Sequence, residues 1–146
     1  MKRTFLATVL SLVFALVAVA CHSDEKVIGY TELPVQAQQF VKQYFPTATY
    51  SRVEKDHGKW EYEVLLSDGT KIDFSDKGDW KSVDCKFSVL PKGIVPTVIL
   101  LDIEKRYPSA QPYKIEKEIG GYEVDIPGFD LYYSQNGTFI RAEIDR

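Results

Sequence analysis

Two pairs of carboxylates are the residues whose spacing most resembles a reactive site. Glu61 and Glu63 stand two positions apart, and so do Glu123 and Asp125. On a strand, residues i and i+2 point to the same face, so each pair presents two carboxylates side by side. Such a pair can hold a cation or act as an acid–base dyad. The alternative, which we favour, is the solvated outer face of a sheet.

Few other residues have the types or spacing that catalysis or metal binding needs. The two histidines are His22, near the N-terminus, and His57, in a turn-like Asp-His-Gly sequence. The acidic loop 73–79 lacks the spacing and the terminal Glu of an EF-hand and is typical of a hairpin turn. We find no His/Cys zinc spacing, Gly-rich phosphate loop or nucleophile elbow. We therefore expect no catalytic residue, no cofactor and no metal.

Aromatic residues beside charged ones suggest a contact surface. Along 138–144 the apolar alternation runs through Ile140, Ala142 and Ile144, which would leave Phe139 on the outer face with Arg141. Aromatic side chains among charged ones are typical of protein-interface hot spots. The alternative is that each aromatic packs against a sheet edge or a turn. The candidate partner-binding residues are Trp80, Phe139, Tyr132, Arg141, Glu61 and Glu63.

An internal repeat must position these residues. Shifting the sequence by 62 positions superposes its landmarks, and after a three-residue deletion the shift becomes 59. The copies share Pro, Gly, aromatic and alternating apolar positions, and no set of reactive groups. This favours a scaffold or binding surface over an enzyme. The matched landmarks are Pro34 with Pro96, Phe45-Pro46 with Tyr107-Pro108, Val53-Glu54 with Ile115-Glu116, Trp60-Glu61 with Tyr122-Glu123, Glu63 with Asp125, Gly78 with Gly137, and Trp80 with Phe139.

Each copy reads as one helix followed by a meander of strands. Pro34 and Pro46 bracket an apolar stripe of helical period, and Pro96 and Pro108 bracket the second. Alternating segments with Asp-Gly and Asn-Gly turns follow. The pattern predicts an α+β fold, in which two tandem helix-plus-antiparallel-meander repeats form one sheet of six to eight strands with two helices packed on one face.

The expected domain organisation follows from the size of the units. Repeat unit 1 spans 33–85, a linker spans 86–94 and repeat unit 2 spans 95–146. Units of about fifty residues are marginal alone, so we expect 33–146 to fold as one cooperative domain.

The N-terminus has the features of an export signal. Lys2 and Arg3 precede an uncharged stretch of 16 residues, 5–20, that ends in small residues. We interpret 1–20 as a signal peptide and 21–32 as a polar tether. Cys21 follows a lipobox-like sequence and is the expected lipid attachment site; ordinary cleavage after Ala20 is the alternative. Cys85 reads as a buried small hydrophobe rather than a reactive thiol.

The net charge limits the partners. It is −3 for the whole chain and becomes −5 once Lys2 and Arg3 are removed. We therefore expect no nucleic-acid partner, and any membrane attachment would come through the lipid on Cys21.

A family resemblance covers nearly the whole mature chain. It is strongest in the motifs of unit 1, which Tyr107-Pro108, Gly121-Tyr122-Glu123-Val124 and Gly137 echo in unit 2. The motifs of unit 1 are Leu33-Pro34, Tyr44-Phe45-Pro46, the stretch 58–64, Asp68-Gly69, Ile72-Asp73-Phe74 and Gly78-Asp79-Trp80. The chain resembles the exported PepSY-like family of Bacteroides-type bacteria, whose units share the fold of β-lactamase-inhibitory protein. The resemblance implies a sheet face available to a protein partner and does not name that partner.

These observations favour a non-enzymatic, exported cell-envelope binding protein, an inhibitor or a sensor, that presents an open sheet face to an unknown envelope protein. The expected location is the outer membrane as a lipoprotein, or the periplasm in soluble form. The alternative function is a small-molecule or glycan binder that uses Trp80 and Trp60 as stacking platforms.

Overall fold

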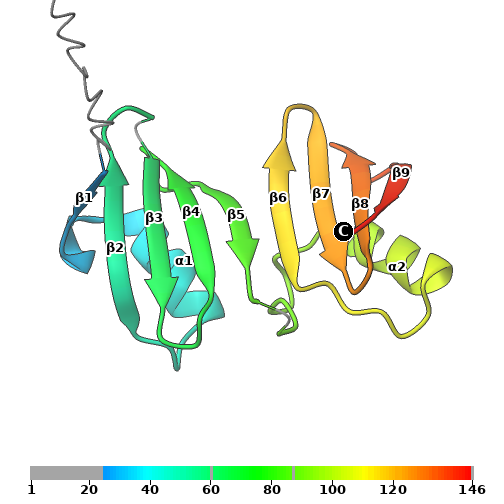
Figure 1. Ribbon diagram of the computed structural model, residues 1–146, viewed down its shortest axis with the longest axis horizontal. Coiled ribbons are helices and arrows are strands. Elements are labelled where there is room, and N and C mark those ends of the chain that lie inside the picture. The colour runs from blue at the N-terminus through cyan, green and yellow to red at the C-terminus, as the bar shows by residue number, and fades with distance from the viewer. Residues whose placement is uncertain (1–24, 60, 87, 146) are drawn as a thin grey trace, which may run out of the picture.

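A single antiparallel sheet runs through both halves of the described chain. The computed structural model describes residues 25–59, 61–86 and 88–145. Its nine strands pair in chain order, each with its neighbours in sequence. Both helices lie on the same side of this sheet and the other side is left open (Figure 1). The predicted α+β class, with two helices packed on one antiparallel sheet, is confirmed.

The elements follow the order of the two repeats. The first half contains β1 (Glu25–Val27), a 3-10 helix (Tyr30–Glu32), α1 (Val35–Tyr44), β2 (Tyr50–Asp56), β3 (Glu61–Leu66), β4 (Lys71–Ser75) and β5 (Trp80–Asp84). The second contains α2 (Thr97–Arg106), β6 (Lys114–Glu118), β7 (Gly121–Ile126), β8 (Phe129–Ser134) and β9 (Phe139–Ile144).

Proline sets the start of both helices. Pro34 and Pro96 occupy the N-cap positions with extended ψ angles of 140° and 137°. Ala37 and Val41 of α1 are buried, and so are Ile99 and Ile103 of α2, as the apolar stripes predict. Among the described residues, no helix has the length and apolar character needed to cross a membrane.

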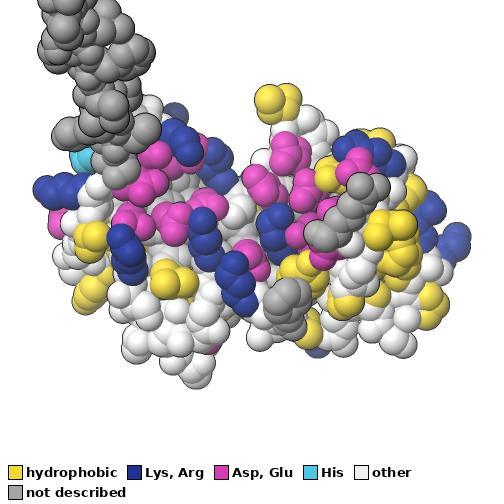
Figure 2. All heavy atoms as spheres, in the orientation of Figure 1, with side chains coloured by type: hydrophobic (Ala, Val, Ile, Leu, Met, Phe, Trp, Pro, Cys, Tyr) yellow, Lys and Arg dark blue, Asp and Glu magenta, His cyan; other side chains and the backbone are white. Residues whose placement is uncertain are grey.

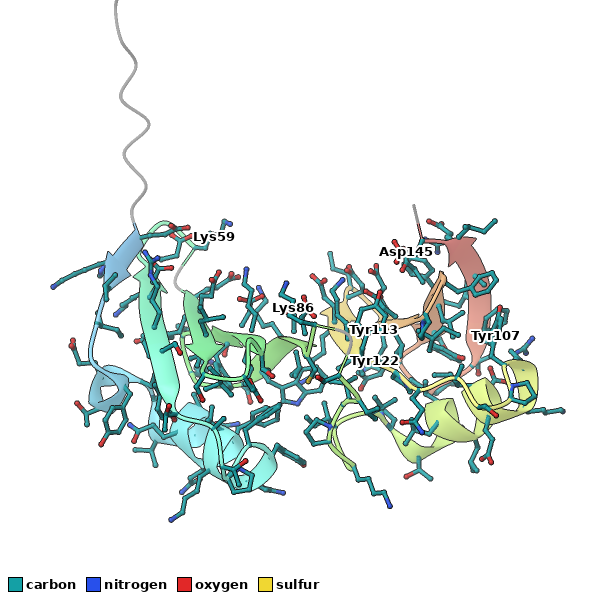
Figure 3. The ribbon with its side chains drawn as sticks, turned by 60° about the horizontal axis from the view of Figure 1, so that its bottom comes forward. Lys59, Lys86, Tyr107, Tyr113, Tyr122 and Asp145 are labelled. Atoms are coloured by element: carbon teal, nitrogen blue, oxygen red, sulfur yellow. The ribbon has the colours of Figure 1, made fainter. Side chains whose placement is uncertain are left out.

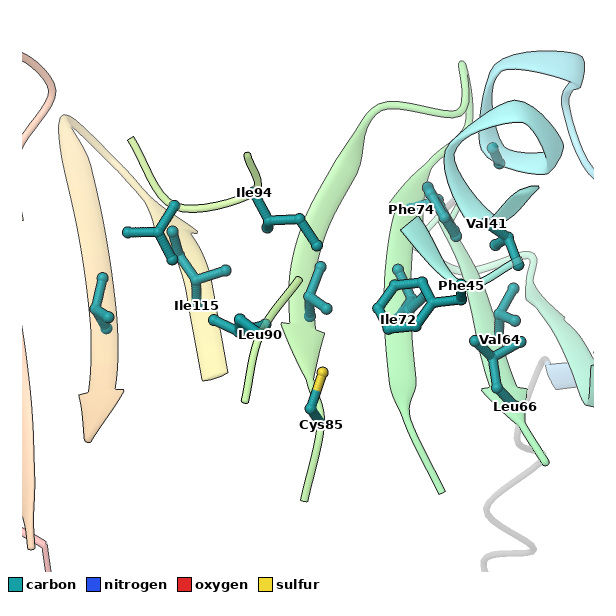
Figure 4. Close-up of a cluster of buried hydrophobic side chains, with 14 of the residues drawn as sticks. Val41, Phe45, Val64, Leu66, Ile72, Phe74, Cys85, Leu90, Ile94 and Ile115 are labelled. Atoms are coloured by element: carbon teal, nitrogen blue, oxygen red, sulfur yellow. The ribbon is translucent and has the colours of Figure 1, made fainter. Parts of the chain in front are cut away.

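One row of apolar side chains joins the two halves into a common core. The row crosses β2 to β8 on the helix-covered face, and every member is at most 2% exposed. The step from Val83 to Ile115 carries it from β5 to β6. Linker residues Leu90 and Ile94 close over that step (Figure 4). The members are Val53, Val64, Ile72, Val83, Ile115, Val124 and Leu131.

The segment expected to be a polar tether contains structure from Glu25 onward. β1 pairs with β2 and adds a ninth strand, one more than the sequence predicted. Tyr30 of the 3-10 helix stacks on Tyr50, with 5.1 Å between ring centroids. All three β1 side chains are exposed, so no apolar alternation marked this strand in the sequence.

The repeat alignment must be corrected at one place, because the β2–β3 turn of unit 1 and the β6–β7 turn of unit 2 differ in length. Glu63 faces Glu54 across β2 and β3, whereas Glu123 faces Glu116 across β6 and β7. Since Glu54 matches Glu116, Glu63 matches Glu123 rather than Asp125. The β6–β7 turn is two residues shorter, because Glu118 pairs with Gly121 across only two residues.

Candidate functional site

The sheet face without helices, which we call the open face, carries a dense set of charged side chains. Figure 2 shows Asp and Glu side chains gathered over both halves of the molecule, with Lys and Arg among them. The helices pack on the opposite face, where the apolar row lies. The open face therefore has no covering layer within the described residues.

Strand register arranges this face into two rows that run from β2 to β9. Together the rows hold nine carboxylates and four bases. The first row is Glu54, Glu63, Asp73, Ser82, Glu116, Glu123, Tyr132 and Arg141. The second is Arg52, Leu65, Lys71, Asp84, Lys114, Asp125, Asp130 and Glu143.

Both members of the first predicted carboxylate pair lie on the open face, and each has a lysine partner. Glu63 lies 2.8 Å from the Nζ of Lys71. Glu61 contacts the Nζ of Lys81. These contacts are part-exposed ion pairs, which contribute little to stability. They support the interpretation of Glu61 and Glu63 as a solvated outer face.

Lys114 forms the centre of the second carboxylate group. Its Nζ lies 3.1 Å from Asp125, 3.4 Å from Glu123 and 3.8 Å from Glu116. Burial opposes the charge on Lys114, but these carboxylates outweigh it and raise its pKa. Sequence reasoning missed Lys114, because nothing in the chain fixes the register of β6 against β7 before the topology is known.

Asp125 is the most buried carboxylate on the open face. It is only 6% exposed, and its Oδ1 has no hydrogen-bond partner. Burial raises the pKa of Asp125 to about 6, although Lys114 acts in the opposite direction. The structure thus places a destabilised negative charge beside Asp130, its neighbour across β7 and β8.

Tyr132 and Arg141 stack on the open face at the β9 end of the sheet. The Cζ of Arg141 lies 3.7 Å from the centre of the Tyr132 ring, and its Nε is 2.7 Å from Glu143. Burial and the nearby Glu123 raise the pKa of Tyr132 to about 12. The aromatic and the guanidinium therefore lie together on the face where the sequence predicted them.

Trp80 and Phe139 do not lie on the open face, and that prediction was wrong. Trp80 pairs with the buried Phe74, and Phe139 pairs with the buried Tyr133. Both point to the helix-covered side. Register irregularities at Asp73/Phe74 and at Tyr132/Tyr133 insert one extra residue into β5 and into β9. A bulge reverses the alternation beyond it.

Both aromatics pack against the helix-side core, and each lies beside a cation. Trp80 lies near Phe40 of α1, with 6.3 Å between centroids, and beneath the Nζ of Lys117 at 3.9 Å. Arg106 of α2 lies 3.9 Å from the Phe139 ring. One Lys–Tyr contact extends the pattern, since the Nζ of Lys55 lies 5.3 Å from the centre of the Tyr62 ring. Tyr122 lies between the two helices in Figure 3.

Cys85 is the cysteine that the structure describes. Cys85 is free and buried, and burial raises the pKa of its thiol to about 11. It is thus a packed side chain rather than a thiolate nucleophile. Cys21 and Trp60 lie outside the described residues, so lipid attachment and the Trp60 stacking platform remain predictions. His57 is exposed in its turn.

Two further observations concern ligands. A hollow of about 550 Å³ lies between the linker and α2, lined mainly by Leu90, Val95, Leu100, Ile103 and Pro112. None of the candidate residues lines it. In the described part of the chain, no group of three or more His, Cys, Asp or Glu side chains is placed to hold a metal ion.

Comparison with solved structures identifies similar proteins from Bacteroides species, each described as a "putative" periplasmic protein. One is "a putative calcium-regulated periplasmic protein" from Bacteroides thetaiotaomicron, 33% identical over 82% of this chain and 97% of that one, with a TM-score of 0.77. Another is "a putative periplasmic protein" of the DUF2874 family from Bacteroides vulgatus, 31% identical over 84% of this chain and 98% of that one, with a TM-score of 0.78. A third, also from Bacteroides vulgatus, has unknown function and is 27% identical over 82% and 98%, with a TM-score of 0.77.

The search of curated proteins gives no match. A family profile described as "Putative beta-lactamase-inhibitor-like, PepSY-like" matches residues 60–141, more than half of the chain. The motifs, the helix-and-meander repeat and the similar structures all agree with that match. The chain belongs to this PepSY-like family.

Proposed function

We propose that this is a non-enzymatic, exported envelope protein that binds a protein partner through its open face. The single observation that carries the proposal is the pair of charged rows, which runs across eight strands and is covered by no helix of the described residues. The periplasmic relatives support an exported location. A lipid on Cys21 would anchor the protein to the outer membrane.

The charge of the open face indicates the chemistry of the partner. Carboxylates outnumber bases in the two rows by nine to four. Burial raises the pKa of Glu116, and neighbouring acids add to the effect, so negative charge is crowded at the centre of the sheet. A basic partner surface relieves this crowding. A surface with an excess of one sign also steers an oppositely charged partner and rejects a like-charged one.

Tyr132 and Arg141 supply the anchor that charge alone does not. Stacked side chains of these types are enriched among interface hot spots. They lie at the end of the first row, with Glu123 facing Tyr132 across β7 and β8. The small-molecule alternative loses support, because Trp80 lies on the helix side and is not free to stack a ligand from the open face.

Capture from envelope extract tests the proposal. The double variant Glu63→Lys, Glu116→Lys reverses one charge in each half of the first row. The matched control Asp76→Lys, Glu104→Lys makes the same change in net charge at exposed positions off the open face. We expect the first variant to lose a partner that the wild type and the control both retain. Equal capture by all three proteins would contradict the proposal.

One relative is described in terms of calcium, so the capture should be run with calcium and with a chelator. A partner held only in calcium would add a cation bridge to the proposed interface. Binding to a glycan array with no protein captured would favour the alternative function.

A further inference from the structure

Among the described residues, no strand pairs with the outer edge of β9. β9 is the last strand of the described sheet and pairs with β8 on its inner side. Ile140 is 57% exposed and Ile144 is 71% exposed. An edge of this length with apolar side chains is a ready template for another strand, and many proteins protect such edges.

The main-chain groups that point outward can be assigned from one hydrogen bond. The N–H of Asp145 donates to the Gly128 oxygen at 3.2 Å. In an antiparallel ladder the direction alternates, so Glu143 and Arg141 direct their main-chain groups to β8. Ala142 and Ile144 therefore direct theirs to the free edge.

We propose that β9 pairs with β9 of a second copy of this chain, antiparallel and centred on Ala142, to form a two-fold dimer. In this register Ala142 meets its own copy as a hydrogen-bonded pair. Arg141 then lies opposite the second copy's Glu143, and Glu143 opposite its Arg141. This is a non-hydrogen-bonded position, where facing side chains approach most closely. The strand is thus complementary to itself, as a two-fold interface requires.

The register is specific to this centre and to this strand. If the two-fold axis instead passed between Ala142 and a residue next to it, Arg141 and Glu143 would each lie opposite an apolar residue of the second copy. At the other edge of the sheet, β1 is only three residues long. The equivalent β1–β1 pairing, centred on Lys26, would place Lys26 opposite Lys26 of the second copy. Like charges directly opposite are destabilising, so β1 does not offer the same interface.

Exposed apolar side chains gather beside the β9 edge. Val98 and Leu101 of α2 are 51% and 61% exposed. α2 packs under β8 and β9, since its Asp102 accepts a hydrogen bond from Tyr133 and its Arg106 stacks on Phe139. With Ile140 and Ile144, four of the ten exposed large hydrophobic residues in the described chain lie on these two elements. Figure 2 shows hydrophobic side chains collected on that side.

This inference goes beyond the proposed function, because it concerns the sheet edge and needs no envelope partner. Sedimentation equilibrium of the purified protein is the test. We expect a monomer–dimer equilibrium. The variants Arg141→Glu and Glu143→Arg each create like-charge pairs twice per dimer and should raise its dissociation constant about tenfold. The exchanged double variant Arg141→Glu, Glu143→Arg recreates the opposite-charge pairs and should return the dissociation constant to the wild-type value.

Two controls separate the edge from other causes. Lys26→Glu on β1 should leave the dissociation constant unchanged. Ala142→Pro removes an outward N–H without touching the β8 ladder and should abolish the dimer. Thermal melts of each variant confirm that the monomer is folded. A protein that stays monomeric, or a dimer that the single reversals do not weaken, would overturn the inference. Open-ended polymers sensitive to Lys26→Glu would also overturn it, since they would require β9 to pair with β1.

Discussion

At the scale of single residues, Asp125 is the group whose environment differs most from its sequence context. The sequence placed it in a solvated pair with Glu123, yet it is 6% exposed with one oxygen lacking a partner. The attraction to Lys114 at 3.1 Å does not compensate for the loss of water. A buried carboxylate of this kind makes the folded protein more stable, rather than less stable, as the pH falls.

The variant Asp125→Asn tests that direction. The pKa of Asp125 is about 6 in the folded protein and 3.8 in its ordinary state, so the folded form binds the proton more tightly. Wild type should therefore gain stability relative to Asp125→Asn as the pH falls from 7 to about 4. The full gain is on the order of 2–3 kcal/mol. Urea unfolding at each pH measures it.

Asp84, in the same row, supplies a control of opposite sign. Burial opposes its charge, but hydrogen bonds from Lys86 outweigh burial and lower the pKa of Asp84. Its contribution is present above about pH 4 and is lost at lower pH. The difference in unfolding free energy between wild type and Asp84→Asn should therefore become smaller as the pH falls. A difference between wild type and Asp125→Asn that also shrinks would contradict the burial argument.

Trp80 and Phe139 carry the second prediction at this scale. Because both pack on the helix side, Trp80→Ala and Phe139→Ala should each cost roughly 2–3 kcal/mol, below the 3–5 kcal/mol of a fully buried aromatic. Thermal melts measure this loss. Tyr132→Ala on the open face is the comparison and should cost less. Melting temperatures unchanged in both helix-side variants would mean that these aromatics are surface groups after all.

At the scale of elements, the sequence predicted the helices and most strands because their signals are local. Proline brackets and apolar periodicity located α1 and α2 to within two residues of their ends. The bulges in β5 and β9 could not be predicted, since an extra residue shows only against a partner strand. That is why Tyr132, Arg141, Glu61 and Glu63 were placed correctly, whereas Trp80 and Phe139 were not.

Two hairpin turns also pack closely against the helices, and the first of these contacts is made by Gly78. Its φ is +91°, and an added Cβ would lie 2.9 Å from the Cβ of Pro34 and 3.0 Å from the Ala37 nitrogen. Gly137 is in the same relation to Val98 of α2. Each turn after β4 or β8 thus rests on the first turn of its own helix.

The pair Gly78→Ala and Gly69→Ala isolates this contact. Both glycines have positive φ, +91° and +87°, but nothing lies within 4 Å of a Cβ at Gly69. Both variants should therefore incur a similar backbone cost, about 1 kcal/mol. Gly78→Ala should lose at least about 1 kcal/mol more, because the helix must move. Equal losses in chemical denaturation would show that the turn does not support α1.

At the scale of the whole molecule, the two halves are joined by one strand pair and one shared core. β5 and β6 pair through Ser82–Glu116, Val83–Ile115 and Asp84–Lys114. The same three pairs continue both rows of the open face and the apolar row beneath them. The binding face and the core therefore depend on the same seam.

This seam predicts a single unfolding transition. A chain that ends at Cys85 would expose Val83 and leave β5 as an open edge, so we expect it to be unfolded or self-associated. Calorimetry of the intact protein should give one cooperative peak. A monomeric, sharply melting fragment would show that unit 1 is a domain in its own right.

The strict chain order of the sheet also bears on how the protein acquires its structure after secretion. Within the described residues each strand pairs with its neighbours in sequence, so each new strand joins the sheet beside the one before it. Pairing between sequence neighbours keeps the contact order below that of a crossover topology, which favours faster folding. A chain that crosses a membrane unfolded, with its N-terminus leading, can add each strand to a growing sheet as it emerges. The meander thereby limits the time for which apolar strands stand exposed to proteases and to aggregation outside the cytoplasm.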